Sequence, residues 1–246
     1  MENKKIALIT GSNRGIGFET ALQLGQQGVT VIITARDLEL AKTAAGKLTD
    51  AGIDAHWFQL DVTSGHDRKL VAAFIAEKFG LLDILVNNAG VAPEDSLFVN
   101  KTIETDQDEF EYIYQTNFFS IVHLTRELLP LLKKSSAGRI VNLSSILGSM
   151  TIQAQDQSPL ENFRVLSYNS AKAALNMFTI LLAAELDGSN IKVNSAHPGW
   201  VQTPLGGNEQ APMTIAEGAK TSVELSLVDA DGPSGKFIHL GAELPW

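Results

Sequence analysis

The chain has 246 residues, of which 44% are hydrophobic and 19% are charged, and it contains no cysteine. The absence of cysteine excludes a disulfide scaffold, a cysteine-ligated metal site and a thiol nucleophile. Because 19 basic residues face 28 acidic ones, the formal net charge is −9, which argues against a nucleic acid or an anionic membrane as partner.

Apolar runs are short throughout the sequence. One of the longest, Val29 to Thr34, ends far short of the roughly 18 consecutive apolar residues that a membrane span requires. The amino-terminal MENKK leads directly into a strand-like stretch at Ile6, which leaves no room for a secretory signal. The five histidines are scattered and lack metal-ligand spacing. We therefore expect a soluble, cytoplasmic protein with no metal and no membrane partner.

Short β-branched runs alternate with longer segments of helical periodicity along the whole chain. We predict strands at Ile6 to Thr10, Val29 to Thr34, His56 to Leu60, Ile84 to Asn87, Ile140 to Leu143, Lys192 to Ala196 and Phe237 to Leu240. We predict helices at Ile16 to Gln27, Leu38 to Leu48, Arg68 to Phe79, Asp108 to Leu132, Tyr168 to Leu186 and Thr214 to Val228. Right-handed crossovers through helices place them on both faces of a mostly parallel sheet. The sequence thus predicts an α/β fold, a single-domain doubly wound (Rossmann) parallel seven-stranded sheet over residues 1–246.

Two segments are longer than this fold requires, Ala92 to Asp106 and Ile146 to Val165. Long ordered loops are usually functional, and both follow predicted strands, whose carboxyl ends border the ligand crevice. A third segment, Gln202 to Met213, contains Gly206, Gly207 and two prolines, which suits a hinged lid over bound cofactor and substrate, while a static loop explains the same composition. We predict substrate loops at about 92–106, 146–166 and 200–213.

The first predicted strand ends in TGSNRGIG, Thr10 to Gly17, and an apolar helix follows at once. A strand, a glycine-rich turn and a helix in this order are typical of a phosphate-binding loop. Gly11 can supply an unusual backbone angle, Gly15 lets the backbone approach a phosphate, and Gly17 lets helix and strand pack closely. Because the helix N-terminus offers free amides and partial positive charge to a pyrophosphate, the segment predicts a dinucleotide site.

Arg36 stands at the end of the second predicted strand, where an NAD-preferring site would carry an acid for the ribose hydroxyls. An arginine there can pair instead with a ribose 2′-phosphate, and Arg14 in the glycine turn supplies a second cation. The sequence therefore favours NADP(H). NAD(H) stays an alternative, because Asp37 rather than Arg36 would face the ribose if the side chains pointed the other way.

The segment Tyr168 to Lys172 reads YNSAK at the start of a predicted helix. A spacing of four residues places Tyr168 and Lys172 on the same face of that helix. The phenol of tyrosine has an ordinary pKa of about 10, and a neighbouring ammonium favours the phenolate and lowers that pKa. The pair therefore predicts a tyrosine that acts as a general acid or base.

Together these motifs resemble those of the short-chain dehydrogenase/reductase family, in its classical-length, carbonyl-reductase-like branch. The resemblance covers nearly the whole chain and keeps the order of the family. The matching pieces are TGSNRGIG at Thr10 to Gly17, DV at Asp61 and Val62, NNAG at Asn87 to Gly90, Asn117 in YQTNFFS, VNLSS ending at Ser145, YNSAK at Tyr168 to Lys172, and HPGWVQT at His197 to Thr203.

The resemblance implies a catalytic set of four residues. Tyr168 would give a proton to a substrate carbonyl oxygen while a hydride arrives from the reduced nicotinamide. Ser145, which aligns better than Ser144, would hydrogen-bond the same oxygen. Lys172 would lower the pKa of the tyrosine and bind the nicotinamide ribose, and Asn117 would hold a water that relays protons to Lys172.

The resemblance also implies a set of cofactor contacts. The turn would hold the phosphates, Asp61 and Val62 would border the adenine, NNAG would line the floor, and HPGWVQT would contact the carboxamide. The predicted cofactor-binding residues are Gly11, Asn13, Arg14, Gly15, Ile16, Gly17, Arg36, Asp61, Val62, Asn88, Ala89, Gly90, Tyr168, Lys172, Pro198, Gly199, Trp200, Val201 and Thr203.

Ser145 and Tyr168 lie further apart than in compact members of the family, and the excess is the stretch Ile152 to Val165. This insertion precedes a helix that many relatives use to pair subunits. A monomer or homodimer is therefore open beside the usual homotetramer. The insertion could instead cap the substrate crevice, with Phe163, Leu166, Leu147, Met150 and Trp200 as candidate contacts.

The function implied is NADPH-dependent reduction of a small-molecule ketone or aldehyde to an alcohol. Two alternatives stand beside it: an NAD-dependent alcohol dehydrogenase of the same fold, and a non-catalytic cofactor-binding sensor. The apolar candidates at the crevice favour an uncharged, partly hydrophobic carbonyl substrate.

Overall fold

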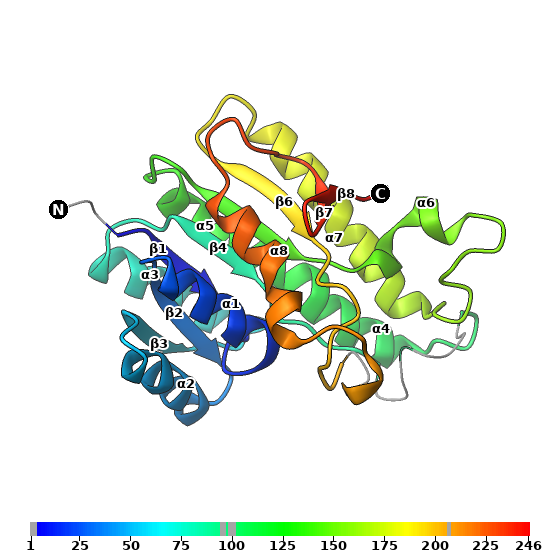
Figure 1. Cartoon of the computed structure of the whole chain (residues 1–246), viewed down its shortest axis with the longest axis horizontal. Coiled ribbons are helices and arrows are strands. Elements are labelled where there is room, and N and C mark those ends of the chain that lie inside the picture. The colour runs from blue at the N-terminus through cyan, green and yellow to red at the C-terminus, as the bar shows by residue number, and fades with distance from the viewer. Residues whose placement is uncertain (1–3, 94–96, 98–101, 206–207) are drawn as a thin grey trace.

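The computed structural model describes residues 4–93, 97, 102–205 and 208–246, and these build one eight-stranded sheet between two helix layers (Figure 1). The strands are β1 Ile6–Ile9, β2 Thr30–Ala35, β3 Ala55–Gln59, β4 Ile84–Asn87, β5 Arg139–Leu143, β6 Lys192–Ala196, β7 Phe237–His239 and β8 Ala242–Glu243. Their order in the sheet is β3-β2-β1-β4-β5-β6-β7-β8. This confirms the doubly wound α/β fold.

The sheet has one strand more than the seven predicted. β1 to β7 pair in parallel, whereas β8 pairs antiparallel with β7. The chain turns between them at Leu240 and Gly241, whose φ angles are 46° and 79°. A two-residue strand with both side chains exposed has no hydrophobic period, so the sequence carried no signal for it.

The helices are α1 Gly15–Gln26, α2 Leu38–Asp50, α3 Gly65–Lys78, α4 Gln107–Tyr114, α5 Ser120–Leu132, α6 Met150–Gln153, α7 Leu166–Glu185 and α8 Ile215–Leu227. Three short turns complete the set: the π-helical turn η1 Gln115–Phe119 and the 3-10 turns η2 Ile146–Gly148 and η3 Asn208–Gln210. The single helix predicted from Asp108 to Leu132 was therefore wrong in one respect. Its periodicity is real, but η1 interrupts it at Asn117.

Alternate residues of each strand pack against different helix layers. On β1, Ile6 and Leu8 join a core cluster with α3, α5 and α7, whereas Ala7 and Ile9 join one with α1, α2 and α8. In Figure 1, α1 and α8 lie side by side over one face of the sheet. Because both faces of the sheet are covered, every residue of β1 and β2 is buried.

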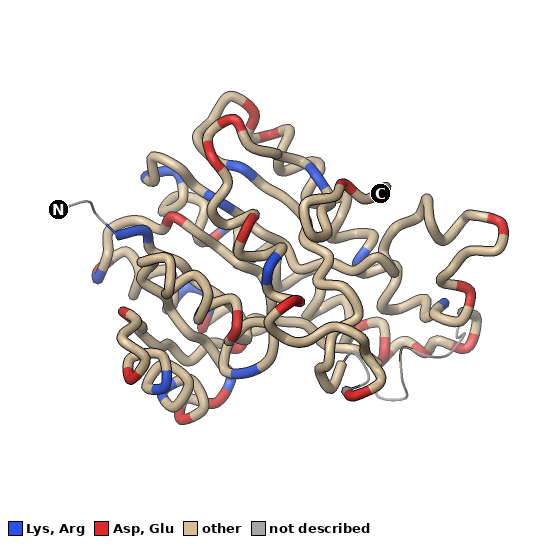
Figure 2. Tube along the Cα trace, in the orientation of Figure 1, with Lys and Arg blue, Asp and Glu red and all other residues tan. Residues whose placement is uncertain are grey.

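The strand order reverses between β1 and β4, which are neighbours although β2 and β3 separate them in the chain. In open α/β sheets, ligands bind beyond the carboxyl ends of the strands at such a switch point. The segments that leave β1 and β4 here are the glycine turn, Thr10 to Gly17, and Asn88 to Gly90. Among the described residues, Lys and Arg are interspersed with Asp and Glu rather than gathered on one face (Figure 2).

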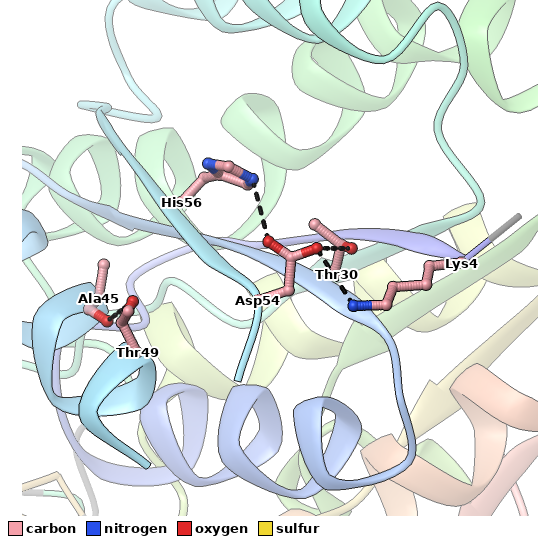
Figure 3. A network of polar contacts seen from close by, with 6 residues as sticks. All are labelled: Lys4, Thr30, Ala45, Thr49, Asp54 and His56. Carbon is pink, nitrogen blue, oxygen red and sulfur yellow. Dashed lines mark hydrogen bonds and ion pairs between the residues drawn. The ribbon is translucent and has the colours of Figure 1, made fainter. Parts of the chain in front are cut away.

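The opposite, amino-terminal edge of the sheet is held by polar side chains. Figure 3 shows Asp54 accepting a hydrogen bond of 2.8 Å from the Thr30 hydroxyl, with Lys4 Nζ at 3.6 Å and His56 Nε2 at 3.4 Å. The Thr30 hydroxyl holds the pKa of Asp54 below its ordinary 3.8. This hydrogen bond therefore stabilises the folded chain above pH 3.8. The stabilisation is lost as the pH falls through the lowered pKa of Asp54.

Asp83 ties three elements together at the same edge, and its side chain is buried. Its Oδ2 accepts from the Ile6 amide at 2.8 Å, and its Oδ1 accepts from the Ser135 hydroxyl at 2.5 Å. We expect Asp83→Ala to lower the free energy of unfolding by about 3 kcal/mol, because two buried donors lose their acceptor. Urea denaturation measures this loss.

Asp187→Ala, at an exposed acid, is the matched control for that variant. NADPH affinity should be the same in both variants, since Asp83 lies at the edge of the sheet away from the glycine turn. Equal urea midpoints for Asp83→Ala and the unchanged chain would show that this carboxylate does not hold the edge.

Candidate active site

A cavity of about 990 Å³ lies beyond the carboxyl ends of β1, β2, β4 and β5. Most of the residues predicted to bind cofactor lie in its wall. They are Gly11, Asn13, Arg14, Gly15, Ile16, Gly17, Arg36, Asp61, Val62, Asn88, Ala89, Gly90, Tyr168, Lys172, Pro198 and Thr203. The cavity has room for a ligand of dinucleotide size.

The glycine turn has the conformation that its sequence predicts. Gly11 and Gly15 have φ angles of 60° and 59°, which favour glycine. At Gly17, an added Cβ would lie 2.4 Å from Asn88 Nδ2, so helix α1 approaches β4 as closely as glycine allows. The residue before α1 is Arg14, whose side chain has no acceptor for the first helix amides. These amides therefore remain available to a phosphate.

Asn88 and Thr10 join the two segments at the switch point. Asn88 Nδ2 donates to the carbonyls of Thr10 at 2.7 Å and Gly11 at 3.1 Å. The Thr10 hydroxyl accepts from the amides of Asn88 and Ala89, each at 2.9 Å. The NNAG segment thus fixes the shape of the glycine turn and forms the cavity floor beside it.

The end of β2 presents Arg36 to the cavity and turns Asp37 away from it. Arg36 is exposed and lies in the cavity wall, as does Arg14. Asp37 is the N-cap of α2, and its Oδ1 accepts from the Leu40 amide at 3.0 Å. The sequence left open whether Arg36 or Asp37 faces the ribose. In the structure Arg36 lies in the cavity wall, whereas the Asp37 carboxylate caps the first turn of α2.

Asp61 lies in the cavity wall and also stabilises the turn that follows β3. Its Oδ1 accepts from both the amide and the hydroxyl of Thr63, at 2.9 and 2.7 Å. Arg68 donates to the Val62 carbonyl at 2.7 Å, beneath the same turn. These bonds fix the backbone of the segment that follows β3.

Tyr168 and Lys172 lie one turn apart on α7, as their spacing predicts, and Lys172 Nζ is 5.6 Å from the centre of the Tyr168 ring. Ser145 follows β5, is half-buried and hydrogen-bonds with Tyr168. The neighbouring Ser144 points elsewhere, since its hydroxyl donates to Asn176 Oδ1 at 2.6 Å. Of the two serines, Ser145 is therefore the one joined to the tyrosine.

The insertion Ile152 to Val165 folds over Tyr168. Leu147, Ile152, Leu160, Val165 and Tyr168 form one buried cluster, and Phe163 packs against it. This burial raises the pKa of Tyr168 to about 12, although the hydrogen bond with Ser145 acts in the opposite direction. The sequence led us to expect that Lys172 lowers the pKa of Tyr168; in the structure, the loss of hydration on burial raises it instead.

Lys172 is buried at the bottom of the cavity, and its Nζ donates to the Leu143 carbonyl at 2.8 Å. Burial lowers its pKa from 10.5 to about 8. The side chain therefore gains or loses its proton near physiological pH. A negatively charged ligand in the cavity would favour the charged form.

Asn117 lies within the π-helical turn η1 and is fully buried. Its side chain makes two bonds with the backbone of Val91, accepting from the amide at 2.9 Å and donating to the carbonyl at 2.8 Å. A Cβ added at Gly90 would lie 3.3 Å from Asn117 Oδ1 and 3.9 Å from Lys172 Nζ. The bulge thus brings a carboxamide close to the lysine, and π-bulges are frequent at functional sites.

Several predicted residues lie outside the cavity wall. Ser145 and Asn117 sit beside it with the contacts described above, and the others are Gly199, Trp200 and Val201. Val201 is buried. Gly199 packs against Met213, because an added Cβ would lie 2.1 Å from the Met213 Sδ. Trp200 is exposed. Of the suggested crevice contacts, Met150 and Leu166 are also exposed, whereas Leu147 and Phe163 pack around Tyr168.

The cavity wall also contains residues that the sequence reasoning missed. They are Ala35, Leu60, Thr63, Val91, Glu111, Tyr112, Gln115, Thr116, Phe119, Leu143, Ser144, Pro204, Leu205 and Ile215. Those on α4 and η1 recur at spacings of three and four, so they share one helix face. The signal that could have found them is the combination of that spacing with Asn117 in the same segment.

The base of the predicted lid is fixed by backbone pairing. Val201 and Met213 form a parallel bridge, with bonds from the Met213 amide to the Trp200 carbonyl and from the Gln202 amide to the Met213 carbonyl. Gly206 and Gly207, the predicted hinges, lie outside the described residues. The lid therefore stays a prediction.

None of the helices in the described part of the chain has the length and apolar character that a membrane span requires. No three His, Asp or Glu side chains there are grouped so that they could hold a metal ion.

The chain is similar to known proteins over nearly its whole length. The family model described as short chain dehydrogenase matches residues 5–214. Carbonyl reductase [NADPH] 1 of Mus musculus is 31% identical, over 99% of each chain. Short-chain dehydrogenase/reductase 1 of Saponaria officinalis is 32% identical, over 96% of this chain and 94% of its own. The structure of NADPH-bound carbonyl reductase from chicken fatty liver superposes with a TM-score of 0.85 at 29% identity, covering 99% of each chain.

Proposed function

Because this chain belongs to the short-chain dehydrogenase family, we propose that it reduces a ketone or aldehyde carbonyl to an alcohol with NADPH, with Tyr168 as the proton donor. The observation that carries this proposal is the buried phenol of Tyr168 beside Ser145 and Lys172 at the end of the cleft. A pKa of about 12 keeps the phenol protonated at neutral pH, which suits a proton donor.

The cleft fits a dinucleotide phosphate in both shape and charge. The open amides of α1 and the glycine turn would hold the pyrophosphate, and Arg14 and Arg36 would hold the ribose 2′-phosphate. NADPH, when bound, supplies the hydride. The mouse relative is named for the same cofactor, and the chicken liver structure contains it.

We assign the remaining roles from the contacts of each side chain. Ser145 orients the substrate oxygen and stabilises the negative charge that develops on it. Lys172 binds the nicotinamide ribose and, when charged, eases proton movement at Tyr168. Asn117 holds a water beside Lys172 through the bulge η1. The loops at about 92–106, 146–166 and 200–213 border the substrate, which is uncharged and partly hydrophobic. For the assembly we propose a monomer or homodimer, with the homotetramer as the alternative.

The two other candidate functions find less support. An NAD-dependent alcohol dehydrogenase would use an acid at the ribose, but Asp37 caps α2. A sensor without turnover would not need the complete set of Ser145, Tyr168 and Lys172. Titration with NADPH and NADH, followed by turnover on a panel of aldehydes, ketones and diketones, tests all three. Tight NADPH binding with turnover supports the proposal, preference for NADH supports the alcohol dehydrogenase, and binding without any turnover supports the sensor.

Arg36→Asp should reverse the cofactor preference. We expect kcat/KM with NADPH to fall by about 10²-fold, because a charge-assisted pair with the 2′-phosphate is replaced by repulsion, while the NADH value is retained or rises. Asp37→Asn is the control, since it keeps a capping oxygen and lies outside the cavity wall. Equal losses with both cofactors would show that Arg36 does not contact the 2′-phosphate.

A further inference from the structure

Three consecutive residues, the last of β5 and the two that follow it, contact three neighbouring turns of α7. The Leu143 carbonyl accepts from Lys172, the Ser144 hydroxyl donates to Asn176, and Ser145 bonds with Tyr168. The first and third of these contacts belong to the proposed reaction. The second is a buried bond that no step of the proposed reaction uses, although Ser144 also lies in the cavity wall.

Asn176 lies one turn after Lys172 on the same face of α7 and is 3% exposed. Its carboxamide binds both sides of the turn that presents Ser145. Oδ1 accepts from the Ser144 hydroxyl at 2.6 Å, and Nδ2 donates to the Gly148 carbonyl at 3.4 Å. Ser145 therefore stands inside a short segment whose two ends are attached to one side chain.

The two ends of that segment differ in how they are fixed. The Ser144 amide donates to the Ala196 carbonyl of β6 at 2.8 Å, so this residue is attached to the sheet. Gly148 is pressed against α7, because an added Cβ would lie 2.7 Å from the carbonyl carbon of Lys172. The bond from Ser144 to Asn176 thus links the sheet to α7, beside the point where Gly148 packs tightly on that helix.

We propose that Asn176 is a positioning residue, which through Ser144 and Gly148 fixes α7 along the end of β5 so that Tyr168 stays in register with Ser145. This inference rests on the proposed function, because the register has a consequence for turnover only if Tyr168 and Ser145 share a substrate oxygen. A helix that slides or rotates slightly would keep its fold and lose that shared geometry.

Ser144→Ala and Asn176→Ala test the proposal. We expect kcat to fall by about 10- to 100-fold in each, because small misplacements of reacting groups cost rates of this order. NADPH affinity should be unchanged, since the glycine turn is untouched. The double variant should be no slower than the worse single one, because both remove the same link. In the oxidation direction, the apparent pKa of the tyrosine should rise, since its bond with Ser145 weakens.

Ser195→Ala is the matched control. Ser195 is a fully buried serine at the end of β6, and its hydroxyl lies 2.9 Å from that of Thr179, one turn further along α7. The variant removes a buried strand-to-helix bond of the same kind without touching the segment around Ser145. We expect a comparable loss of thermal stability and an unchanged kcat. If Asn176→Ala does not fold, Asn176→Leu is used in its place, because leucine keeps a similar side-chain volume and removes both polar contacts.

Crystal structures of Ser144→Ala and Ser195→Ala give a readout that does not need turnover. The proposal expects the Ser145–Tyr168 hydroxyl separation to exceed hydrogen-bond distance in the first variant only. An unchanged separation in Ser144→Ala, or a kcat as high as that of Ser195→Ala, would overturn it. If the unchanged chain turns over no carbonyl compound, the proposed function fails, and the two structures still decide the inference.

Discussion

Tyr168→Phe is expected to lower kcat for carbonyl reduction by about 10²- to 10⁴-fold, the range typical of losing a general acid. The substitution removes only the hydroxyl. The ring that packs with Leu147, Ile152, Leu160 and Val165 is retained, so folding and NADPH affinity should be preserved. Steady-state kinetics together with a fluorescence titration of NADPH separate the loss of turnover from any loss of binding.

Tyr112→Phe provides the matched control for this prediction. Tyr112 lies in the wall of the same cavity but is 48% exposed, and it is not part of the buried cluster around Tyr168. Removing its hydroxyl should leave kcat unchanged. Undiminished turnover in Tyr168→Phe, or equal losses in the two variants, would defeat the assignment of Tyr168 as proton donor.

The sequence was sufficient for features that depend on local pattern. The hydrophobic periodicity predicted seven of the strands. The glycine turn was predicted from the succession of a strand, a glycine-rich turn and a helix. The positive φ angles at Gly11 and Gly15 follow from the same local geometry. Lys172 falls one turn after Tyr168 because helix spacing is fixed.

Features that depend on contacts distant in the chain could not be read from the sequence. Asp37 turns to the Leu40 amide because α2 begins there, a choice of direction that composition leaves open. The pKa of Tyr168 depends on how residues 152–165 fold over it, and the sequence suggested the opposite direction. The π-helical turn at Asn117 accompanies two bonds from that side chain to the backbone of Val91, a residue distant in the chain.

Lys172→Met combines a large catalytic effect with an unusual stability effect. We expect kcat to fall by about 10²-fold or more, because Tyr168 loses the neighbouring charge. Stability should move the other way in the ligand-free protein. The folded chain holds the Lys172 proton only up to a pH of about 8, whereas the unfolded chain holds it up to 10.5. Keeping the ammonium buried at neutral pH therefore costs about 3 kcal/mol.

The sign of the pH dependence follows from that difference. Between pH 8 and 10.5 the unfolded chain binds more protons than the folded one, so the unchanged protein gains stability as the pH rises through this window. Lys172→Met lacks this gain. At pH 7 the variant should be more stable by about 1–2 kcal/mol, since the unpaired Leu143 carbonyl offsets part of the relief.

Urea denaturation of both proteins at pH 7 and at pH 10 measures this difference, with Lys133→Met, at an exposed lysine, as the control. The advantage of Lys172→Met should shrink or reverse at pH 10, while Lys133→Met shows no such trend. Tyr168 is present in all three proteins, so its own titration cancels. A stability difference that is independent of pH would mean that Lys172 keeps its ordinary pKa. The lysine would then be hydrated, and it could not be the buried charge that the reaction at Tyr168 requires.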